Sequence, residues 1–219
     1  MVDNQSPEIF GQTPSQTVGP YFHYGLPWKG CADLVGVSEM GARTDLFPAE
    51  NYKLNVSTAR EAVIGDVIEI FGLVTDGAGT PVPDCLIEIW QADAAGIYNT
   101  TGDPRWAKSN HDGFPGYGRC ATSAEGFYRF RTIMPGRVPS PDGGLQAAHI
   151  AISVFGRGML KRLATRMYFD GGEGNDQDIV LNAVPAERRD TIIARRDEGD
   201  SWRMDIVLRG DNETAFFDI

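Results

Sequence analysis

The sequence is poor in several features that mark particular classes of protein. It has only three cysteines in 219 residues, Cys31, Cys85 and Cys120, and no two of them stand in a C-x-x-C spacing. An odd number of cysteines without metal-ligand spacing favours reduced, buried thiols over a disulfide framework or a zinc site. No run of 18 apolar residues occurs, so the sequence predicts no membrane-spanning segment.

Positive charge is also scarce. The chain has 20 Lys and Arg residues against 30 Asp and Glu residues, a formal net charge of −10 at pH 7. Nucleic-acid binding needs a cationic stripe, and the sequence shows none, so no nucleic-acid partner is expected. The N-terminal stretch "MVDNQSPEIFGQ" has neither the basic nor the apolar region of a secretory signal, which predicts a cytoplasmic location.

What the sequence does contain is strand patterning after a start rich in proline and glycine. Residues 1–65 are predicted to form an N-terminal arm that contacts a partner, and residues 66–219 a single β-sandwich domain. We expect a hairpin from residues 67–75 and 85–93, and one helix over about residues 185–196. The fold class is therefore all-β, with one or two short helices. Further strands are expected at residues 126–133, 147–155, 163–169, 202–208 and 214–219.

The predicted strand 147–155 carries one histidine, His149. A second residue on the same face of the strand would be residue 151, and Ala151 stands there. The residues alone leave open whether His149 is a metal ligand, a relic of a metal site or a hydrogen-bonded core residue.

Several motifs, in the right order, resemble the intradiol ring-cleaving dioxygenases, and most closely the alpha chain of an alpha/beta enzyme of that family. The resemblance covers most of the chain from Thr13 onward, and residues 28–67 are the least patterned part. The motifs are "TPSQTVGPYF" (13–22), "GLVTDGAGTPVPDCLIEIWQADAAGIY" (72–98), "GYGRCATSAEGFYRFRTIMPG" (116–136), "AAHIAIS" (147–153) and "RMYFDG" (166–171).

The resemblance implies a β-sandwich subunit of a large alpha/beta hetero-oligomer. The implied substrates are O2 and a catechol that bears a carboxylate, whose ring is cleaved between the two hydroxylated carbons. In this family the chain that performs the chemistry holds one non-heme Fe(III) with two tyrosines and two histidines. Phenolates are hard anionic donors that favour Fe(III), and neutral imidazoles complete the set.

Matching this pattern residue by residue finds two of the four expected metal ligands. Tyr98 matches the first tyrosine and His149 the first histidine, whereas Val138 stands at the second tyrosine position and Ala151 at the second histidine position. Neither a valine nor an alanine side chain offers a lone pair. The resemblance therefore implies a vestigial site with no metal and no catalytic residue in this chain, and places the iron in the partner beta chain.

The resemblance also assigns substrate contacts to this chain, in a site shared with the partner. Those residues are Thr17, Gly19 and Pro20 in the N-terminal loop, and Arg157 in "FGRG". Gly19 permits close backbone approach and Pro20 stiffens the loop, while an arginine beyond a strand end can bind a carboxylate bidentately. Without the resemblance, the residues alone favour a simpler interpretation, in which the loop is a tight turn that anchors the arm and Arg157 is an exposed surface arginine.

Two other functions remain open. The first is a self-sufficient dioxygenase for another catechol, with ligands recruited from Tyr117, Tyr128 or His111. The second is a non-catalytic β-sandwich that binds a partner or serves a structural role.

Overall fold

The structure is a computed structural model, and it describes most of the chain beyond the N-terminal region. Pro20, His23 and His111, and most of the predicted N-terminal arm, lie outside the described residues. The described residues are 16–19, 22, 31–36, 38, 40, 63–106 and 114–218.

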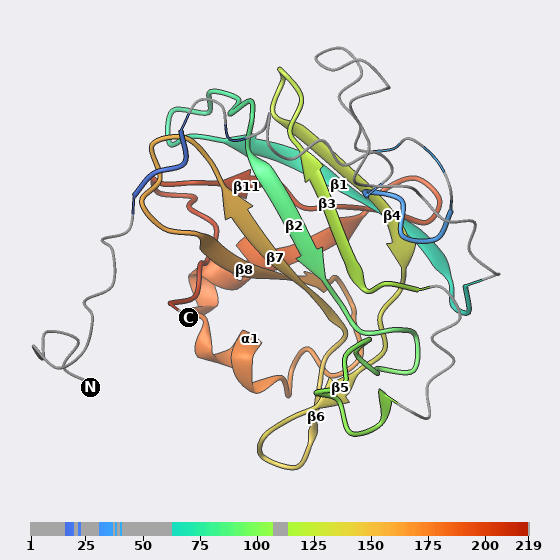
Figure 1. Cartoon of the computed structure of the whole chain (residues 1–219). Coiled ribbons are helices and arrows are strands. Elements are labelled where there is room, and N and C mark those ends of the chain that lie inside the picture. The colour runs from blue at the N-terminus through green and yellow to red at the C-terminus, as the bar shows by residue number, and fades with distance from the viewer. Residues whose placement is uncertain are drawn as a thin grey trace, which may run out of the picture.

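Strands make up most of the regular secondary structure of the described chain, as predicted (Figure 1). Two short helical segments follow β8, which agrees with the one or two short helices expected. The elements are β1 Val67–Thr75, β2 Leu86–Trp90, β3 Tyr117–Ala121, β4 Phe127–Ile133, β5 Val138–Pro139, β6 Leu145–Gln146, β7 His149–Phe155, β8 Leu163–Phe169, α1 Ile179–Ala183, a 3-10 helix Ala186–Ile192, β9 Ile193–Arg196, β10 Ser201–Arg203 and β11 Ile206–Val207.

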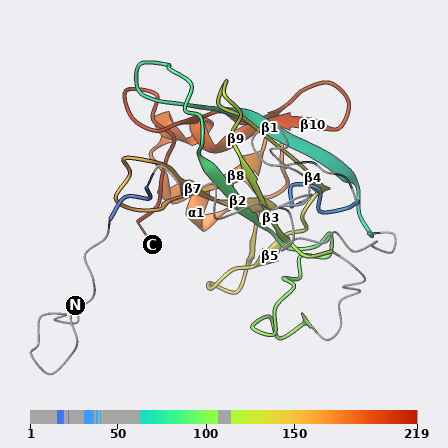
Figure 2. The same cartoon turned by 45° about the horizontal axis from the view of Figure 1, so that its top comes forward.

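The strands form two layers that β9 joins. One layer contains β1 with β4, β10 and β11, and the other contains β3, β2, β7 and β8 in that order. β9 runs parallel to β8 and antiparallel to β10, so a continuous hydrogen-bonded path connects the layers. Figure 1 shows β2, β3 and β7 in front of β1, and Figure 2 shows the same arrangement with the top of the molecule brought forward.

Alternation along the strands explains why the two layers pack face to face. In β1 every second residue is buried, including Ile68, Ile70 and Val74. In β7 the buried aliphatic residues are Ile150, Ile152 and Val154, and both sets belong to one apolar cluster. Because successive side chains of a strand point to opposite faces, burying one face of β7 turns residues 149, 151 and 153 toward the other.

The predicted hairpin of β1 with β2 is wrong. β1 pairs with β4 over seven residues, while β2 pairs with β3 and β7. The turn after β1 does form, since Asp76 N–H donates to Thr80 O and Thr75 bridges Pro81, but the chain then crosses into the other layer. Alternation identifies a strand and its buried face and does not choose the partner strand.

The predicted helix over residues 185–196 is right only in its first part, which forms a 3-10 helix at Ala186–Ile192, whereas residues 193–196 form β9. The α-helix is α1, which starts after Asp178, whose carboxylate accepts hydrogen bonds from Val180 N and Leu181 N. A 3-10 helix follows, and Ile193 then enters the sheet beside Tyr168 as β9. Ile193 and Ala194 therefore belong to a strand, whereas Ile192 is the last residue of the 3-10 helix.

The C-terminal strands are shorter than predicted. The strand expected at residues 202–208 is broken between β10 and β11, where the Asp205 carboxylate accepts a hydrogen bond from Leu73 N in place of a backbone carbonyl. For residues 214–219 the described part shows only an isolated bridge between Phe217 and Ala164. No helix of the described residues has the length and apolar character needed to cross a membrane.

Candidate functional site

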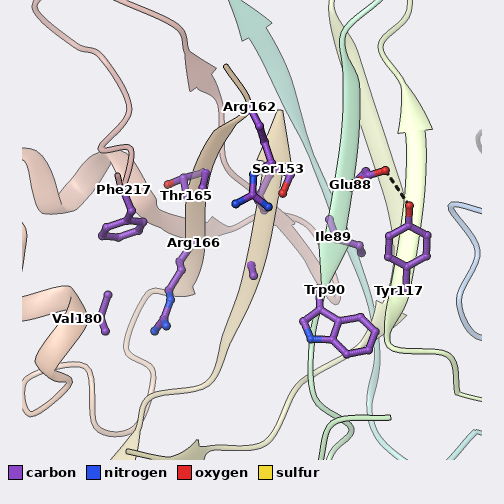
Figure 3. A pocket seen from close by; sticks show the side chains of 13 residues that line it. Glu88, Ile89, Trp90, Tyr117, Ser153, Arg162, Thr165, Arg166, Val180 and Phe217 are labelled. Carbon is purple, nitrogen blue, oxygen red and sulfur yellow. Dashed lines mark hydrogen bonds between the residues drawn. The ribbon is translucent and has the colours of Figure 1, made fainter. Parts of the chain in front are cut away.

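The candidate site lies on the face of the β2, β7 and β8 layer that points away from the apolar core. Trp90 of β2 is opposite Ala151 of β7, and Ala151 is opposite Arg166 of β8. These three residues therefore form one row across three strands, with the smallest side chain in the middle. Figure 3 shows Trp90 and Arg166 on either side of β7.

Two cavities open on this face and share Trp90 and Arg166. The first has a volume of about 460 Å³ and the second of about 530 Å³. The first is lined by Trp90, Tyr98, Thr100, Gly102, Asp103, Pro104, Arg105, Val138, Pro139, Gln146, His149 and Arg166. The second, drawn in Figure 3, is lined by Glu88, Ile89, Trp90, Tyr117, Ala151, Ile152, Ser153, Arg162, Ala164, Thr165, Arg166, Val180 and Phe217.

Tyr98 is held over the first cavity by the loop between β2 and β3. Its ring stacks on Trp90 with a centroid separation of 5.9 Å and an interplanar angle of 7°. Its backbone N–H donates to Asp103 Oδ2 at 3.1 Å. Burial raises the pKa of the Tyr98 phenol above its usual value, so this tyrosine is neutral at pH 7.

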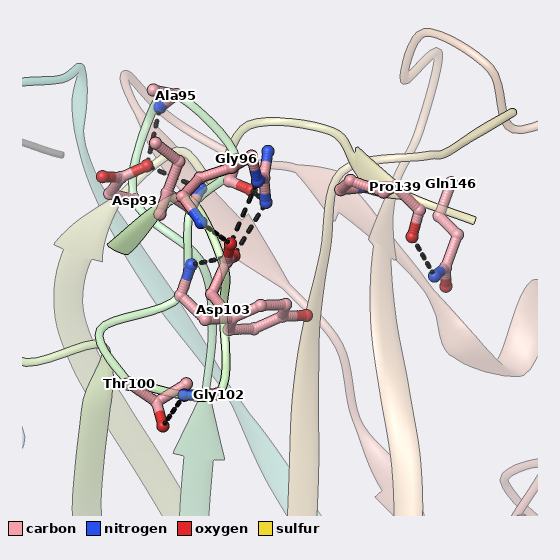
Figure 4. A network of polar contacts seen from close by, with 11 residues as sticks. Asp93, Ala95, Gly96, Thr100, Gly102, Asp103, Pro139 and Gln146 are labelled. Atoms are coloured by element: carbon pink, nitrogen blue, oxygen red, sulfur yellow. Dashed lines mark hydrogen bonds and ion pairs between the residues drawn. The ribbon is translucent and has the colours of Figure 1, made fainter. Parts of the chain in front are cut away.

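A polar network fixes the same loop (Figure 4). The Asp103 carboxylate accepts hydrogen bonds from the guanidinium and the backbone N–H of Arg105, and Arg105 Nη2 also donates to Gly96 O at 2.6 Å. The hydrogen bonds from Arg105 lower the pKa of Asp103 to about 2. Arg105 is thus already paired with a carboxylate of its own loop.

Val138 and His149 meet Tyr98 at the first cavity. Val138 begins β5, pairs with Gln146 of β6 and is buried, and Figure 4 shows the neighbouring hydrogen bond from Gln146 Nε2 to Pro139 O. Three of the four positions matched to the family's ligands therefore line one cavity. The fourth, Ala151, lines the neighbouring cavity that shares Trp90 and Arg166.

His149 is a buried imidazole with one satisfied ring nitrogen. Its Nδ1 donates to Ala147 O at 2.8 Å, because a carbonyl oxygen can only accept. Burial, aided by the nearby positive charge of Arg166, lowers the pKa of His149 to about 4. The ring is therefore neutral at pH 7, with its Nε2 lone pair available.

The residues at this site do not fit a ferric ion. Tyr98 and His149 offer two donors, and the valine and alanine at the matched positions offer none. Arg166 adds a positive charge to the lining of both cavities, which opposes a metal cation. Within the part of the chain that the structure describes, no group of three His, Cys, Asp or Glu side chains could hold a metal.

The two predicted substrate-binding segments lie side by side, at the other end of β7. Val18 forms a parallel bridge with Arg157, and Gly158 N–H donates to Thr17 Oγ1 at 2.7 Å. Gly19 O accepts a hydrogen bond from Phe22 N at 3.1 Å, and an added Cβ on Gly19 would meet no atom of the described residues within 4 Å. The glycine is thus open on its exposed side.

The Arg157 side chain is half exposed and weakly held. It is 52% exposed, and its Nη2 lies 3.6 Å from Asp84 Oδ2. An exposed ion pair of this kind contributes about 0–1 kcal/mol, so the guanidinium can exchange Asp84 for another carboxylate at little cost.

The alternative ligands Tyr117 and Tyr128 are already engaged. Tyr128 is buried in the core and donates to Met204 O at 2.6 Å, and Tyr117 donates to Glu88 Oε1 at 2.8 Å. Burial raises the pKa of each phenol well above its usual value, which disfavours the phenolate that iron requires.

Sequence reasoning missed Arg166. It stands in the quoted motif "RMYFDG" but received no role, because its importance depends on the register between β7 and β8. The register places it directly beside Ala151, a neighbour 15 positions away in sequence.

Comparison with known proteins agrees with this fold. The family profile described as "Dioxygenase" matches residues 45–210. The alpha chain of protocatechuate 3,4-dioxygenase from Burkholderia cepacia is 38% identical over 215 residues, which are 95% of this chain and 98% of that protein. The chain belongs to the intradiol dioxygenase family. Members of this family are non-heme iron enzymes that cleave aromatic rings.

Two further relatives refine the comparison. A protocatechuate 3,4-dioxygenase beta chain, also from Burkholderia cepacia, is 37% identical over 179 residues, which are 78% of this chain and 76% of that protein. The solved dioxygenase domain of a carbohydrate-binding fusion protein from Streptomyces sp. SirexAA-E is 25% identical, with a TM-score of 0.55 over 93% of this chain and 99% of that one. This intradiol dioxygenase chain thus resembles both chain types of a two-chain enzyme.

Proposed function

We propose that this chain is the alpha subunit of a protocatechuate 3,4-dioxygenase. The enzyme cleaves 3,4-dihydroxybenzoate with O2 between its two hydroxylated carbons and yields 3-carboxy-cis,cis-muconate. Both oxygen atoms enter the product, so no further reductant is needed. The ferric ion belongs to the beta chain, and residues 1–65 form an arm that contacts that partner.

The incomplete ligand set carries this proposal. A chain that is similar to a named alpha chain along 95% of its length has a valine and an alanine where an iron enzyme needs donors. The chain keeps the fold of the family, and the guanidinium of Arg166 lines its first cavity. These observations support a subunit that shapes a shared active site rather than one that holds its metal.

The surface around β7 supports the role of this chain in substrate binding. The Thr17–Gly19 segment and Arg157 come from distant parts of the sequence and lie against each other through one bridge and one hydrogen bond. This segment and Arg157 form a wall whose exposed guanidinium can bind the substrate carboxylate bidentately. Pro20, the remaining predicted substrate contact, lies outside the described residues.

Co-expression with a beta chain tests the proposal. The lone chain should purify without iron and show no protocatechuate-dependent oxygen uptake, whereas the co-expressed complex should contain iron and consume oxygen. His149→Ala in this chain should leave the iron content of the complex unchanged.

Stoichiometric iron in the lone chain would contradict the proposal and favour the self-sufficient enzyme. An active beta chain whose oxygen uptake does not change when this chain is added would instead favour a structural role.

A further inference from the structure

Arg166 is a half-buried cation without a carboxylate partner among the described residues. Its Nη1 donates to Gln146 Oε1 at 2.7 Å and to the Tyr168 hydroxyl at 3.2 Å, and both acceptors are neutral. Tyr168 in turn donates to Asp178 Oδ1, but the Asp178 oxygens also accept three backbone N–H groups. A partly desolvated charge is costly unless it is paired, so this arrangement suits an external anion.

The row across the strands leaves space in front of this guanidinium. Ala151 separates Trp90 from Arg166, and its single methyl group cannot fill the gap between an indole and a guanidinium. The first cavity, of about 460 Å³, lies within the range of small-molecule binding sites. Trp90, Tyr98 and Pro139 give it flat apolar surfaces.

The same cavity offers a second polar end. His149 Nδ1 is used by Ala147 O, so Nε2 is left as an acceptor. Neither that nitrogen nor the Tyr98 hydroxyl forms a hydrogen bond with another described residue, although both residues line the cavity. A neutral acceptor and a phenol suit a hydroxyl group rather than a second charge.

We propose that this cavity binds a planar aromatic carboxylate with a ring hydroxyl, the carboxylate on Arg166 and the hydroxyl beside His149 and Tyr98. The aromatic ring of the ligand lies against Trp90 and Tyr98. Binding needs no metal, because the donors and the acceptor belong to this chain. The inference stands on these contacts and does not require the proposed function.

Titration calorimetry with 4-hydroxybenzoate tests the site. This probe has the carboxylate and one hydroxyl but lacks the second hydroxyl of a catechol. The full chain should bind one equivalent, and Arg166→Gln should weaken binding about 10- to 100-fold, as expected for the loss of a charge-assisted hydrogen bond. Arg195→Gln, which removes an exposed guanidinium of β9 that lines neither cavity, should leave the affinity unchanged.

Two further probes separate the parts of the ligand. Phenol lacks the carboxylate and inorganic phosphate lacks the ring, so each should bind about tenfold more weakly or worse. Circular dichroism of both variants checks that they are folded. If the lone chain does not fold, the titration is made on the complex with its partner, where Arg166→Gln should remove one binding equivalent per alpha chain.

Three results would overturn the inference. They are no saturable binding of 4-hydroxybenzoate, equal binding by wild type and Arg166→Gln, and phosphate binding as tight as that of the aromatic acid.

Discussion

At the scale of single residues, the lowered pKa of His149 has a consequence that can be measured. Its neutral form is favoured in the folded state because it is buried near Arg166, which lowers its pKa from 6.5 to about 4. The unfolded chain takes up a proton near pH 6.5, so between pH 6.5 and 4 the unfolded state binds more protons than the folded state. The free energy of unfolding should therefore fall as the pH drops through this window.

We expect His149 to account for about 3 kcal/mol of that fall between pH 7 and 4. Denaturant unfolding of wild type and His149→Gln at several pH values measures it, and the difference between the two free energies should shrink toward pH 4. Parallel curves for the two proteins would show that His149 is not held neutral.

The residue scale also shows what sequence can predict of the site. The family motifs identified Tyr98, Val138 and His149 as residues at metal-ligand positions. In the structure all three line one cavity. The roles of Thr17, Gly19, Pro20 and Arg157 remain predictions, although the structure places Thr17 and Arg157 against adjoining backbone. Arg166 needed the strand register, which no local pattern in the sequence encodes.

At the scale of elements, the sequence predicted the positions of the strands more accurately than the pairing between them. β4, β7 and β8 lie within a few residues of the expected ranges, because alternation reports burial directly. The predicted hairpin of β1 with β2 is wrong because strand pairing depends on contacts between residues far apart in sequence. Those contacts place β1 and β2 in different layers. The predicted helix was right only for residues 186–192, because Ile193 enters the sheet beside Tyr168, and α1 was missed because it depends on the Asp178 cap.

The β7–β8 pair also explains why simple restoration of the metal ligands should fail. Val138→Tyr with Ala151→His supplies four donors, but the new histidine would lie beside Arg166, whose charge repels Fe(III). We expect this double variant to purify with little iron, and addition of Arg166→Gln to raise the iron content toward one equivalent.

Elemental analysis and the visible absorption of tyrosinate bound to Fe(III) measure the outcome. Addition of Arg195→Gln to the double variant is the matched control and should not raise the iron content. Full iron loading of the double variant alone would show that Arg166 does not oppose the metal.

At the scale of the whole molecule, the proposed function depends on the assembly of this chain with its beta partner. Arg157→Ala in the assembled enzyme should weaken protocatechuate binding by about 1.5–3 kcal/mol, the usual value for a hydrogen bond to a charged group. Catechol lacks the carboxylate, so its binding should change little. Steady-state KM values for both substrates measure the difference, with Arg195→Ala as the control. Equal losses for both substrates would remove the carboxylate role.

The four residues of β9 affect how the two layers of the molecule can separate. Because Ile193 and Ala194 pair with β8 while Arg195 and Arg196 pair with β10, the two layers cannot separate without breaking the pairing of β9 to one of them. The two halves of the sandwich therefore form one cooperative unit, in which amide hydrogens of both layers become exchangeable together. We therefore expect the cavity on the face of one layer to keep its shape until the other layer opens as well.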